Sequence, residues 1–151
     1  MQPDAAARKH FEVRSARNAE FFRSDQPWAA ISISSRADHP QLDARNRVGL
    51  LQLAFFDTAD PSHPQAITRS QADAILDFVE PIWERVESLL IHCEIGLSRS
   101  PAVAAALSRI YYQEEGPWFQ FDFPNRLVYR RLLEAAAERS GGAGPGSPAG
   151  N

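Results

Sequence analysis

A nine-residue run in the middle of the chain, His92-Cys93-Glu94-Ile95-Gly96-Leu97-Ser98-Arg99-Ser100, most strongly limits the folds open to this sequence. The segment before it, residues 88–91, is short and apolar, which is typical of a buried strand. The segment after it, residues 101–107, is rich in alanine and opens with Pro101, which we expect at the first position of a helix. The sequence therefore predicts a strand, a tight loop and a helix in direct succession.

A loop of this kind is suited to hold an anion. Backbone N–H groups and the positive end of the helix dipole meet at a helix N-terminus. The same field favours the thiolate form of Cys93, the only cysteine in the chain. Arg99 adds a planar fork of donors that matches phosphate oxygens. We therefore predict a phosphate- or sulfate-binding loop with a nucleophile at its base. The predicted anion-binding residues are Glu94, Ile95, Gly96, Leu97, Ser98 and Arg99.

The string His-Cys-x5-Arg-Ser, set between a strand and a helix, resembles the signature loop of the cysteine-dependent protein tyrosine and dual-specificity phosphatase superfamily. It is most similar to the small bacterial tyrosine-phosphatase-like members, over about residues 28–138. The resemblance implies that Cys93 attacks phosphorus and that the Ser100 hydroxyl helps the sulfur to leave in the second step. It also implies that His92 supports the loop without exchanging protons with substrate. Ser100 is at the same time a candidate helix N-cap.

The leaving group of a phosphoester needs a proton, which a carboxylic acid on a nearby loop can supply. Asp57 and Asp60 both follow a predicted strand and so belong to the carboxyl edge of the sheet, beside the signature loop. The run Phe56-Asp57-Thr58 resembles the acid-bearing segment of dual-specificity phosphatases, whereas Asp60 is closer to that family's usual separation from the cysteine. We favour Asp57 as the general acid and keep Asp60 as the alternative. Either aspartate could instead be a turn residue.

The predicted fold is α/β, with a mostly parallel central sheet, helices on both faces and the signature loop between a central strand and a helix. A capping-box pattern, Thr68-Arg69-Ser70-Gln71, opens one helix, and Pro81 is expected to kink or restart it. Residues 1–139 form a single predicted phosphatase domain, and residues 140–151 form a flexible Gly/Pro/Ser tail. The predicted strands cover residues 28–34, 49–56 (placed centrally) and 89–93, and the remaining helices run from Ser100 to about Glu115 and from Pro124-Asn125 onward.

Composition narrows the possible partners. The chain has 151 residues and a net charge near −3, which argues against nonspecific binding to nucleic acid. A single cysteine permits no internal disulfide, and a reactive thiol persists best in a reducing compartment. No stretch approaches the roughly 20 apolar residues that span a bilayer, and the N-terminus lacks the pattern of a signal peptide. We therefore expect a cytoplasmic protein with no membrane partner, and neither a cofactor nor a metal ion.

The leading functional prediction is hydrolysis of phosphotyrosine, with or without dual specificity, in a phosphorylated protein or a small phosphomonoester. A cysteine enzyme of the rhodanese or arsenate-reductase type also holds an anion around its thiol, but it lacks this string with an upstream acid. A pseudophosphatase that binds phosphorylated ligands without turnover is the alternative from another class. The presence of Cys93, Arg99 and Ser100 argues against it.

Overall fold

The structure is a computed structural model that describes residues 8–141. Four strands form one parallel sheet in the order β1-β4-β2-β3. β4 (Ser88–Cys93) and β2 (Trp28–Ser34) are central, and β1 (His10–Ser15) and β3 (Arg47–Ala54) are the edges. Because all four strands run in one direction, their carboxyl ends meet at one edge of the sheet, where Cys93 ends β4. The predicted α/β class is confirmed.

The position of β3 differs from the prediction. An apolar run from Gly49 to Phe56 was expected to be a central strand, but β3 pairs only with β2 and closes one side of the sheet. Its residues alternate between half-buried and exposed, and Val48 and Leu50 reach solvent. All seven residues of β2, by contrast, are buried. A run of apolar residues is therefore compatible with an edge strand when one face packs and the other stays partly open.

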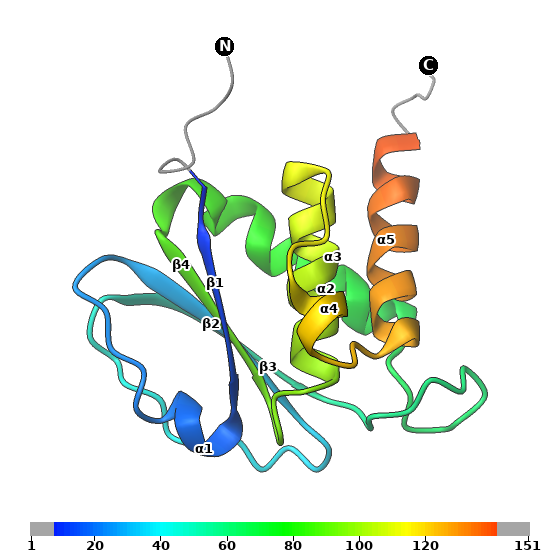
Figure 1. The fold of residues 1–151 in the computed structure, drawn as a ribbon, viewed down its shortest axis with the longest axis horizontal. Helices are drawn as coiled ribbons and strands as arrows, with labels where there is room; N and C mark the ends of the chain where they lie inside the picture. The colour runs from blue at the N-terminus through cyan, green and yellow to red at the C-terminus, as the bar shows by residue number, and fades with distance from the viewer. Residues whose placement is uncertain (1–7, 142–151) are drawn as a thin grey trace.

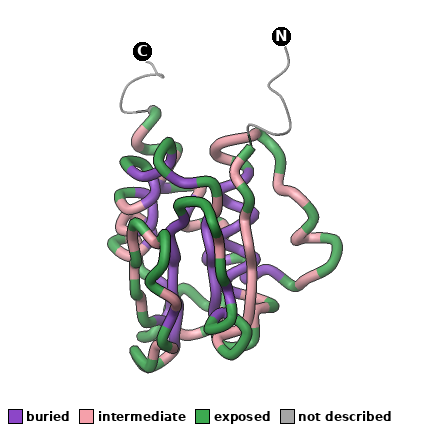
Figure 2. The backbone as a smooth tube through the Cα atoms, turned by 90° about the vertical axis from the view of Figure 1, so that its left-hand side faces the viewer, coloured by how far each residue is buried: buried purple, intermediate pink, exposed green. Residues whose placement is uncertain are grey.

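Helices cover the two faces of the sheet unequally (Figure 1). One face carries α2 (Arg69–Ile82), α3 (Arg99–Tyr112) and α5 (Arg126–Gly141), which pack with Ile31, Leu89 and Ile91 in the main core. The opposite face carries the four-residue α1 (Ala16–Ala19), and Phe22 and Leu42 from the neighbouring loops complete a smaller core there. The central strands form the buried interior of the molecule (Figure 2).

The helix boundaries follow local chemistry. Thr68 and Gln71 form the predicted capping box of α2, and Pro81 lies in its last turn, followed by a 3₁₀ turn at Trp83–Arg85. α3 begins at Arg99 with Ser98 as its N-cap residue, so Pro101 is its third residue rather than its first. The carboxamide of Asn125 accepts from the first free amides of α5. A short helix, α4 (Trp118–Phe121), had no sequence prediction.

The single phosphatase domain over residues 1–139 stays a prediction, and the structure describes residues 8–139 of it. Residues 140 and 141 end α5, and the rest of the predicted tail lies outside the described residues. Within residues 8–141, none of the helices is long and apolar enough to cross a membrane.

Candidate active site

The signature loop joins β4 to α3, as the sequence predicts. Cys93 is 2% exposed, and its Sγ lies 3.1 Å from the Ser100 hydroxyl and 3.2 Å from the Gly96 N–H that donates to it. Gly96 has φ +87, and a Cβ there would lie 2.7 Å from the backbone nitrogen of Ser15. Only glycine fits this tight loop without moving β1. The sulfur therefore has two hydrogen-bonding groups beside it, one from the loop and one from the first turn of the helix that follows.

The two serines of the loop have roles that the sequence alone did not separate. Ser98, not Ser100, is the N-cap residue of α3, and its hydroxyl points to the carboxylate of Asp57 at 2.8 Å instead of to the helix amides. Ser100 lies within the first turn of α3, fully buried against the sulfur. The N-cap interpretation of Ser100 is wrong, because α3 begins at Arg99 and the Ser100 hydroxyl contacts the Cys93 sulfur.

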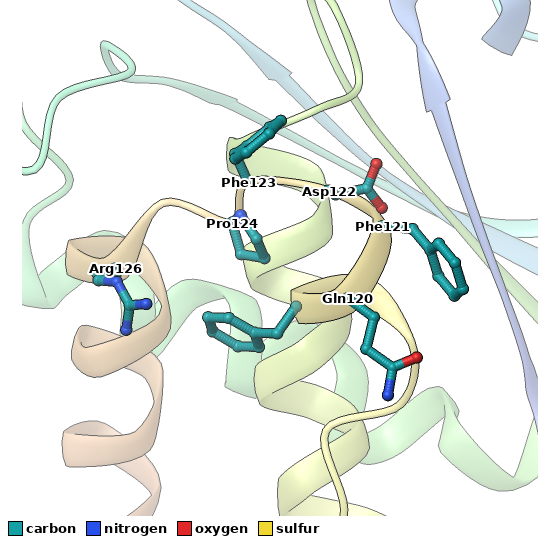
Figure 3. A pocket seen from close by; sticks show the side chains of 7 residues that line it. Gln120, Phe121, Asp122, Phe123, Pro124 and Arg126 are labelled. Atoms are coloured by element: carbon teal, nitrogen blue, oxygen red, sulfur yellow. The ribbon is translucent and has the colours of Figure 1, made fainter.

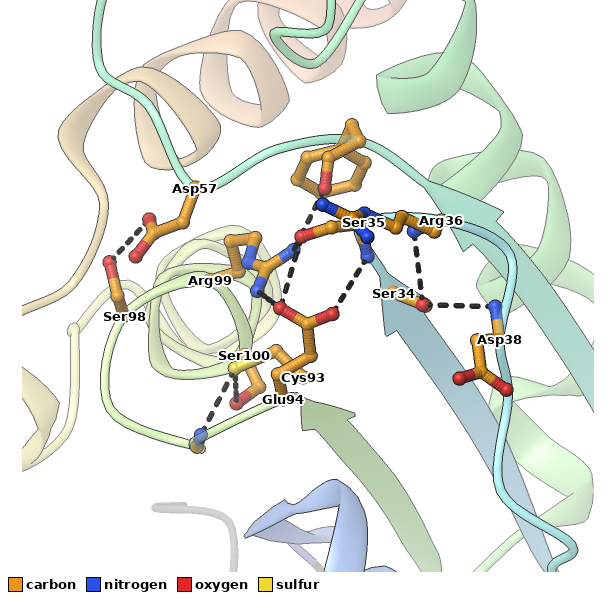
Figure 4. Close-up of polar contacts among 12 residues, drawn as sticks. Ser34, Ser35, Arg36, Asp38, Asp57, Cys93, Glu94, Ser98, Arg99 and Ser100 are labelled. Carbon is orange, nitrogen blue, oxygen red and sulfur yellow. Dashed lines mark hydrogen bonds and ion pairs between the residues drawn. The ribbon is translucent and has the colours of Figure 1, made fainter.

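Arg99 is 4% exposed and is held by three other segments (Figure 4). Its Nη1 donates to the Ser35 hydroxyl at 3.0 Å and to the Phe55 carbonyl at 2.8 Å. Its Nη2 donates to the Glu94 carboxylate at 2.9 Å. Its buried Nε has no hydrogen-bond partner among the described residues. A buried N–H without a partner is costly, so the Nε group is a donor that an anion in the loop can satisfy.

Glu94, predicted as an anion-binding residue, also orients the side chain of Arg99. Its carboxylate accepts from Arg99 and from the hydroxyl and backbone N–H of Ser35. The hydrogen bond from Arg99 is the largest favourable contact that lowers the pKa of Glu94. Glu94 therefore stays ionised at neutral pH and fixes the plane of the guanidinium from one side. Ser35, which directly follows β2, was not predicted from the sequence as a site residue.

Arg99→Lys is expected to lower kcat/KM for aryl phosphates by about 10²–10³-fold, the usual cost of losing one oriented donor to developing charge. A lysine ammonium is a single point of charge and cannot reproduce the planar fork. Steady-state kinetics would measure the loss, with Arg130→Lys on the exposed face of α5 as the control. Equal losses in both variants, or none in Arg99→Lys, would contradict an anion-binding role for Arg99.

The two candidate acids lie in different surroundings. Asp57 follows β3 and reaches the signature loop, where its Oδ1 accepts from Ser98 and from Asn125, both at 2.8 Å. Its Oδ2 accepts no hydrogen bond within the described part of the chain. Asp60 is exposed and its Oδ1 accepts from the backbone and hydroxyl of Ser62. These bonds lower the pKa of Asp60 and hold its carboxylate in a local turn, away from the signature loop that Asp57 reaches.

Asn125 links Asp57 to the last helix, and the sequence indicated Asn125 only as part of a helix start. Its Oδ1 accepts from the amides of Leu127 and Val128, both at 3.0 Å. Its Nδ2 donates to Asp57 and, at 3.1 Å, to the carbonyl of Thr58. The residue is 6% exposed, so these bonds form away from solvent. One side chain thus caps α5 and orients the loop that carries Asp57.

Asn125→Ser and Asn125→Ala separate these two roles. Serine keeps an N-cap acceptor but loses the amide donor, whereas alanine loses both. We expect both variants to lower kcat about ten-fold, because the loop that carries Asp57 loses a buried partner. Only Asn125→Ala should lose a further ~1 kcal/mol in the free energy of unfolding, measured by urea denaturation. Wild-type kcat in Asn125→Ser would show that Asn125 is only a cap.

Exposed apolar side chains surround the mouth of the loop. Ile95 and Leu97 are 73% and 49% exposed, and with Phe21 they line a hollow of about 440 Å³ beside Gly96. Phe123 is 82% exposed, and its backbone N–H donates to the Leu97 carbonyl, which places it beside the signature loop. The segment from α4 to α5 forms a second hollow of about 290 Å³ (Figure 3). Apolar side chains therefore lie beside the signature loop, and the hollow next to Gly96 also has polar side chains, from Arg14, Asn18 and Asp122.

The described residues contain no cluster of three or more His, Cys, Asp or Glu that could hold a metal ion. His92 is fully buried at the end of β4, with its Nδ1 3.2 Å from the Cys93 carbonyl.

Comparisons with known proteins give the fold a name. No protein-family model and no curated protein sequence matches the chain. Among solved structures, human tyrosine phosphatase-like serine/threonine/tyrosine-interacting protein matches with a TM-score of 0.63 at 16% identity, over 85% of this chain and 92% of that one. A mouse putative dual specificity phosphatase complexed with zinc tungstate matches with a TM-score of 0.59 at 19% identity, over 85% and 83%. Human DUSP28 matches with a TM-score of 0.59 at 16% identity, over 87% and 94%.

The chain therefore has the fold of the cysteine-dependent protein tyrosine and dual-specificity phosphatase superfamily. The resemblance drawn from the His-Cys-x5-Arg-Ser string is confirmed at the level of the fold. At these identities the shared fold does not identify a substrate.

Proposed function

We propose that this protein is a metal-free phosphatase that hydrolyses phosphotyrosine or related aryl phosphomonoesters through a covalent phosphate on Cys93. The observation that carries the proposal is that Cys93, Ser100, Arg99 and Asp57 meet at one edge of the sheet. They supply a nucleophile, a group beside the sulfur, an anion ligand and an acid. These four parts are what transfer of a phosphoryl group to a thiol requires.

In the proposed first step the Cys93 thiolate attacks phosphorus in line with the leaving oxygen. The S–P bond forms, the P–O bond to the aryl group breaks, and Asp57 protonates the leaving oxygen. Arg99 and the loop amides from Glu94 onward hold the three other phosphoryl oxygens. In the second step Asp57 takes a proton from water as the water attacks phosphorus. The thiolate leaves, with the Ser100 hydroxyl as its hydrogen-bond donor, and inorganic phosphate is released.

The exposed apolar side chains beside the signature loop favour a substrate with an aromatic or apolar group next to the phosphate. Ile95, Leu97 and Phe123 offer contact area to a tyrosyl ring and to its flanking side chains. The Glu94 carboxylate would repel a headgroup that carries several phosphates. The solved neighbour PTPMT1, which is in complex with PI(5)P, has the same fold, so lipid substrates belong among the compounds tested. A reducing compartment such as the cytoplasm is part of this proposal, because a single reactive thiol needs one.

The proposal is tested by assaying a phosphotyrosyl peptide, a phosphoseryl peptide, a phosphoinositide, a nucleotide and thiosulfate side by side, with a chelator present. Release of phosphate chiefly from the phosphotyrosyl peptide is the expected result. Tungstate or phosphate binding with no turnover of any ester would instead identify a pseudophosphatase. Transfer of sulfur from thiosulfate would identify a rhodanese-type enzyme. Loss of ester hydrolysis on chelation would contradict the metal-free mechanism.

A further inference from the structure

A chain of polar side chains runs through the sheet from the surface to the nucleophile. His39, in the loop after β2, has its Nδ1 2.8 Å from the Ser32 hydroxyl. The same hydroxyl lies 2.6 Å from Nε2 of His92, whose Nδ1 is 3.2 Å from the Cys93 carbonyl. Ser32 and His92 are directly paired across β2 and β4, and both are fully buried. A buried serine and histidine are retained only if their polar atoms are satisfied, and these contacts satisfy them.

We propose that His39 and Ser32 are positioning residues that set the tautomer of His92 and thereby hold the Cys93 carbonyl at the start of the signature loop. The inference deepens the proposed function, on which its kinetic part rests. Neither residue touches the reacting atoms, so both act through His92.

The direction of each hydrogen bond is set by the Cys93 carbonyl, the last group in this row of polar contacts. The Cys93 carbonyl only accepts, so Nδ1 of His92 must carry a hydrogen. In a neutral ring Nε2 is then bare and must accept from the Ser32 hydroxyl. Ser32 has a single hydrogen, so its oxygen is left to accept from Nδ1–H of His39. All donors therefore point from His39 toward Cys93.

The surroundings of both rings favour the neutral form that this direction needs. Burial is the largest cause that lowers the pKa of His92, and the nearby His39 lowers it further, although the hydrogen bond to the Cys93 carbonyl opposes them. Burial also lowers the pKa of His39, although the neighbouring Asp38 opposes it. A proton added to His92 would aim two donors at the Ser32 oxygen and leave the serine hydrogen without an acceptor. The unfolded polypeptide takes up protons below the ordinary histidine pKa of 6.5. The stability that the hydrogen-bonded His39, Ser32 and His92 contribute is therefore present above that pH and falls as the pH drops below it.

The variants are chosen so that packing and hydrogen bonding separate. Ser32→Ala and His39→Leu remove a link, whereas His39→Asn keeps an N–H close to the position of Nδ1. Ser108→Ala removes another buried serine hydroxyl, from α3, and is the matched control. On a phosphotyrosyl peptide, we expect kcat about ten-fold lower in Ser32→Ala and His39→Leu, with KM little changed, because one buried partner is left unsatisfied in each. His39→Asn should recover most of the loss, and Ser108→Ala should retain wild-type kcat.

A second measurement does not depend on activity. Ring ¹⁵N NMR of the wild-type protein at pH 7.5 should show both His39 and His92 as Nδ1–H tautomers, and Ser32→Ala should shift the Nε2 signal of His92. An Nε2–H tautomer at His92, or wild-type kcat in Ser32→Ala, would overturn the inference. If the wild-type protein hydrolyses no ester, the proposed function fails, and the NMR result still decides whether the chain sets the tautomer of His92.

Discussion

Cys93→Ser is expected to reduce phosphotyrosine hydrolysis by more than about 10⁴-fold, because an alcohol is far less nucleophilic than a thiolate at neutral pH. Serine is close to cysteine in size, so the loop should keep its shape around Gly96 and Ser100. Binding of phosphate or tungstate, measured by calorimetry, should therefore stay within a few-fold of the wild-type affinity. The pair of results separates chemistry from binding at one residue.

Trapping of the intermediate completes this test. Rapid acid quench of the wild-type protein with a ³²P-labelled phosphotyrosyl peptide should leave label on the protein, and Cys93→Ser should leave none. Ser100→Ala should increase the labelled fraction, since the Ser100 hydroxyl 3.1 Å from the sulfur no longer helps the thiolate to leave. Near wild-type turnover in Cys93→Ser would exclude the covalent mechanism.

Asp57→Asn is expected to slow phosphotyrosine hydrolysis by about 10²–10⁴-fold, the usual contribution of general acid catalysis. Asparagine can keep the contacts with Ser98 and Asn125 through its carbonyl oxygen, so the loop stays in place while the proton is lost. The loss should shrink for aryl phosphates with acidic leaving groups, which need less protonation. The basic limb of the pH–rate profile should also flatten, because the group whose proton loss sets that limb is gone.

Asp60→Asn is the matched control on the same loop. Its carboxylate bonds to Ser62 within a local turn, so we expect a small change in kcat. If Asp60→Asn instead shows the loss that depends on the leaving group and Asp57→Asn is near neutral, the assignment is reversed and the phosphatase mechanism survives. If neither variant matters, the proton comes from another group, and the resemblance to the superfamily fails at this residue.

Features encoded by neighbouring residues were predictable. The strand, loop and helix around Cys93 follow one another along the chain, so their apolar and small residues already indicate how they fold. The start of α2 was predicted from the capping box of Thr68 and Gln71, and the structure forms that box. The phosphatase-like fold follows from the same loop, because the resemblance rests on residues within one short segment.

Features made by distant segments were not predictable. The edge position of β3 depends on which strands pair, and an apolar run does not indicate which strands will lie beside it. Ser35 meets Arg99 across 64 residues and Asn125 meets Asp57 across 68, so no local pattern marks either pair. The spacing to Cys93 pointed to Asp60 and the Phe56-Asp57-Thr58 run to Asp57, and only their hydrogen bonds favour one of them.

The residue types of the signature loop, from His92 to Ser100, are those that hold an anion around a thiol, and they were readable from the sequence alone. The orientation of its groups was decided by packing. Arg99 takes its direction from Ser35, Phe55 and Glu94, and His92 meets Ser32 because β2 and β4 lie side by side in register. The physical reason is range: helix propensity and loop chemistry act over a few residues, whereas buried hydrogen bonds form only after the sheet has brought separate segments together.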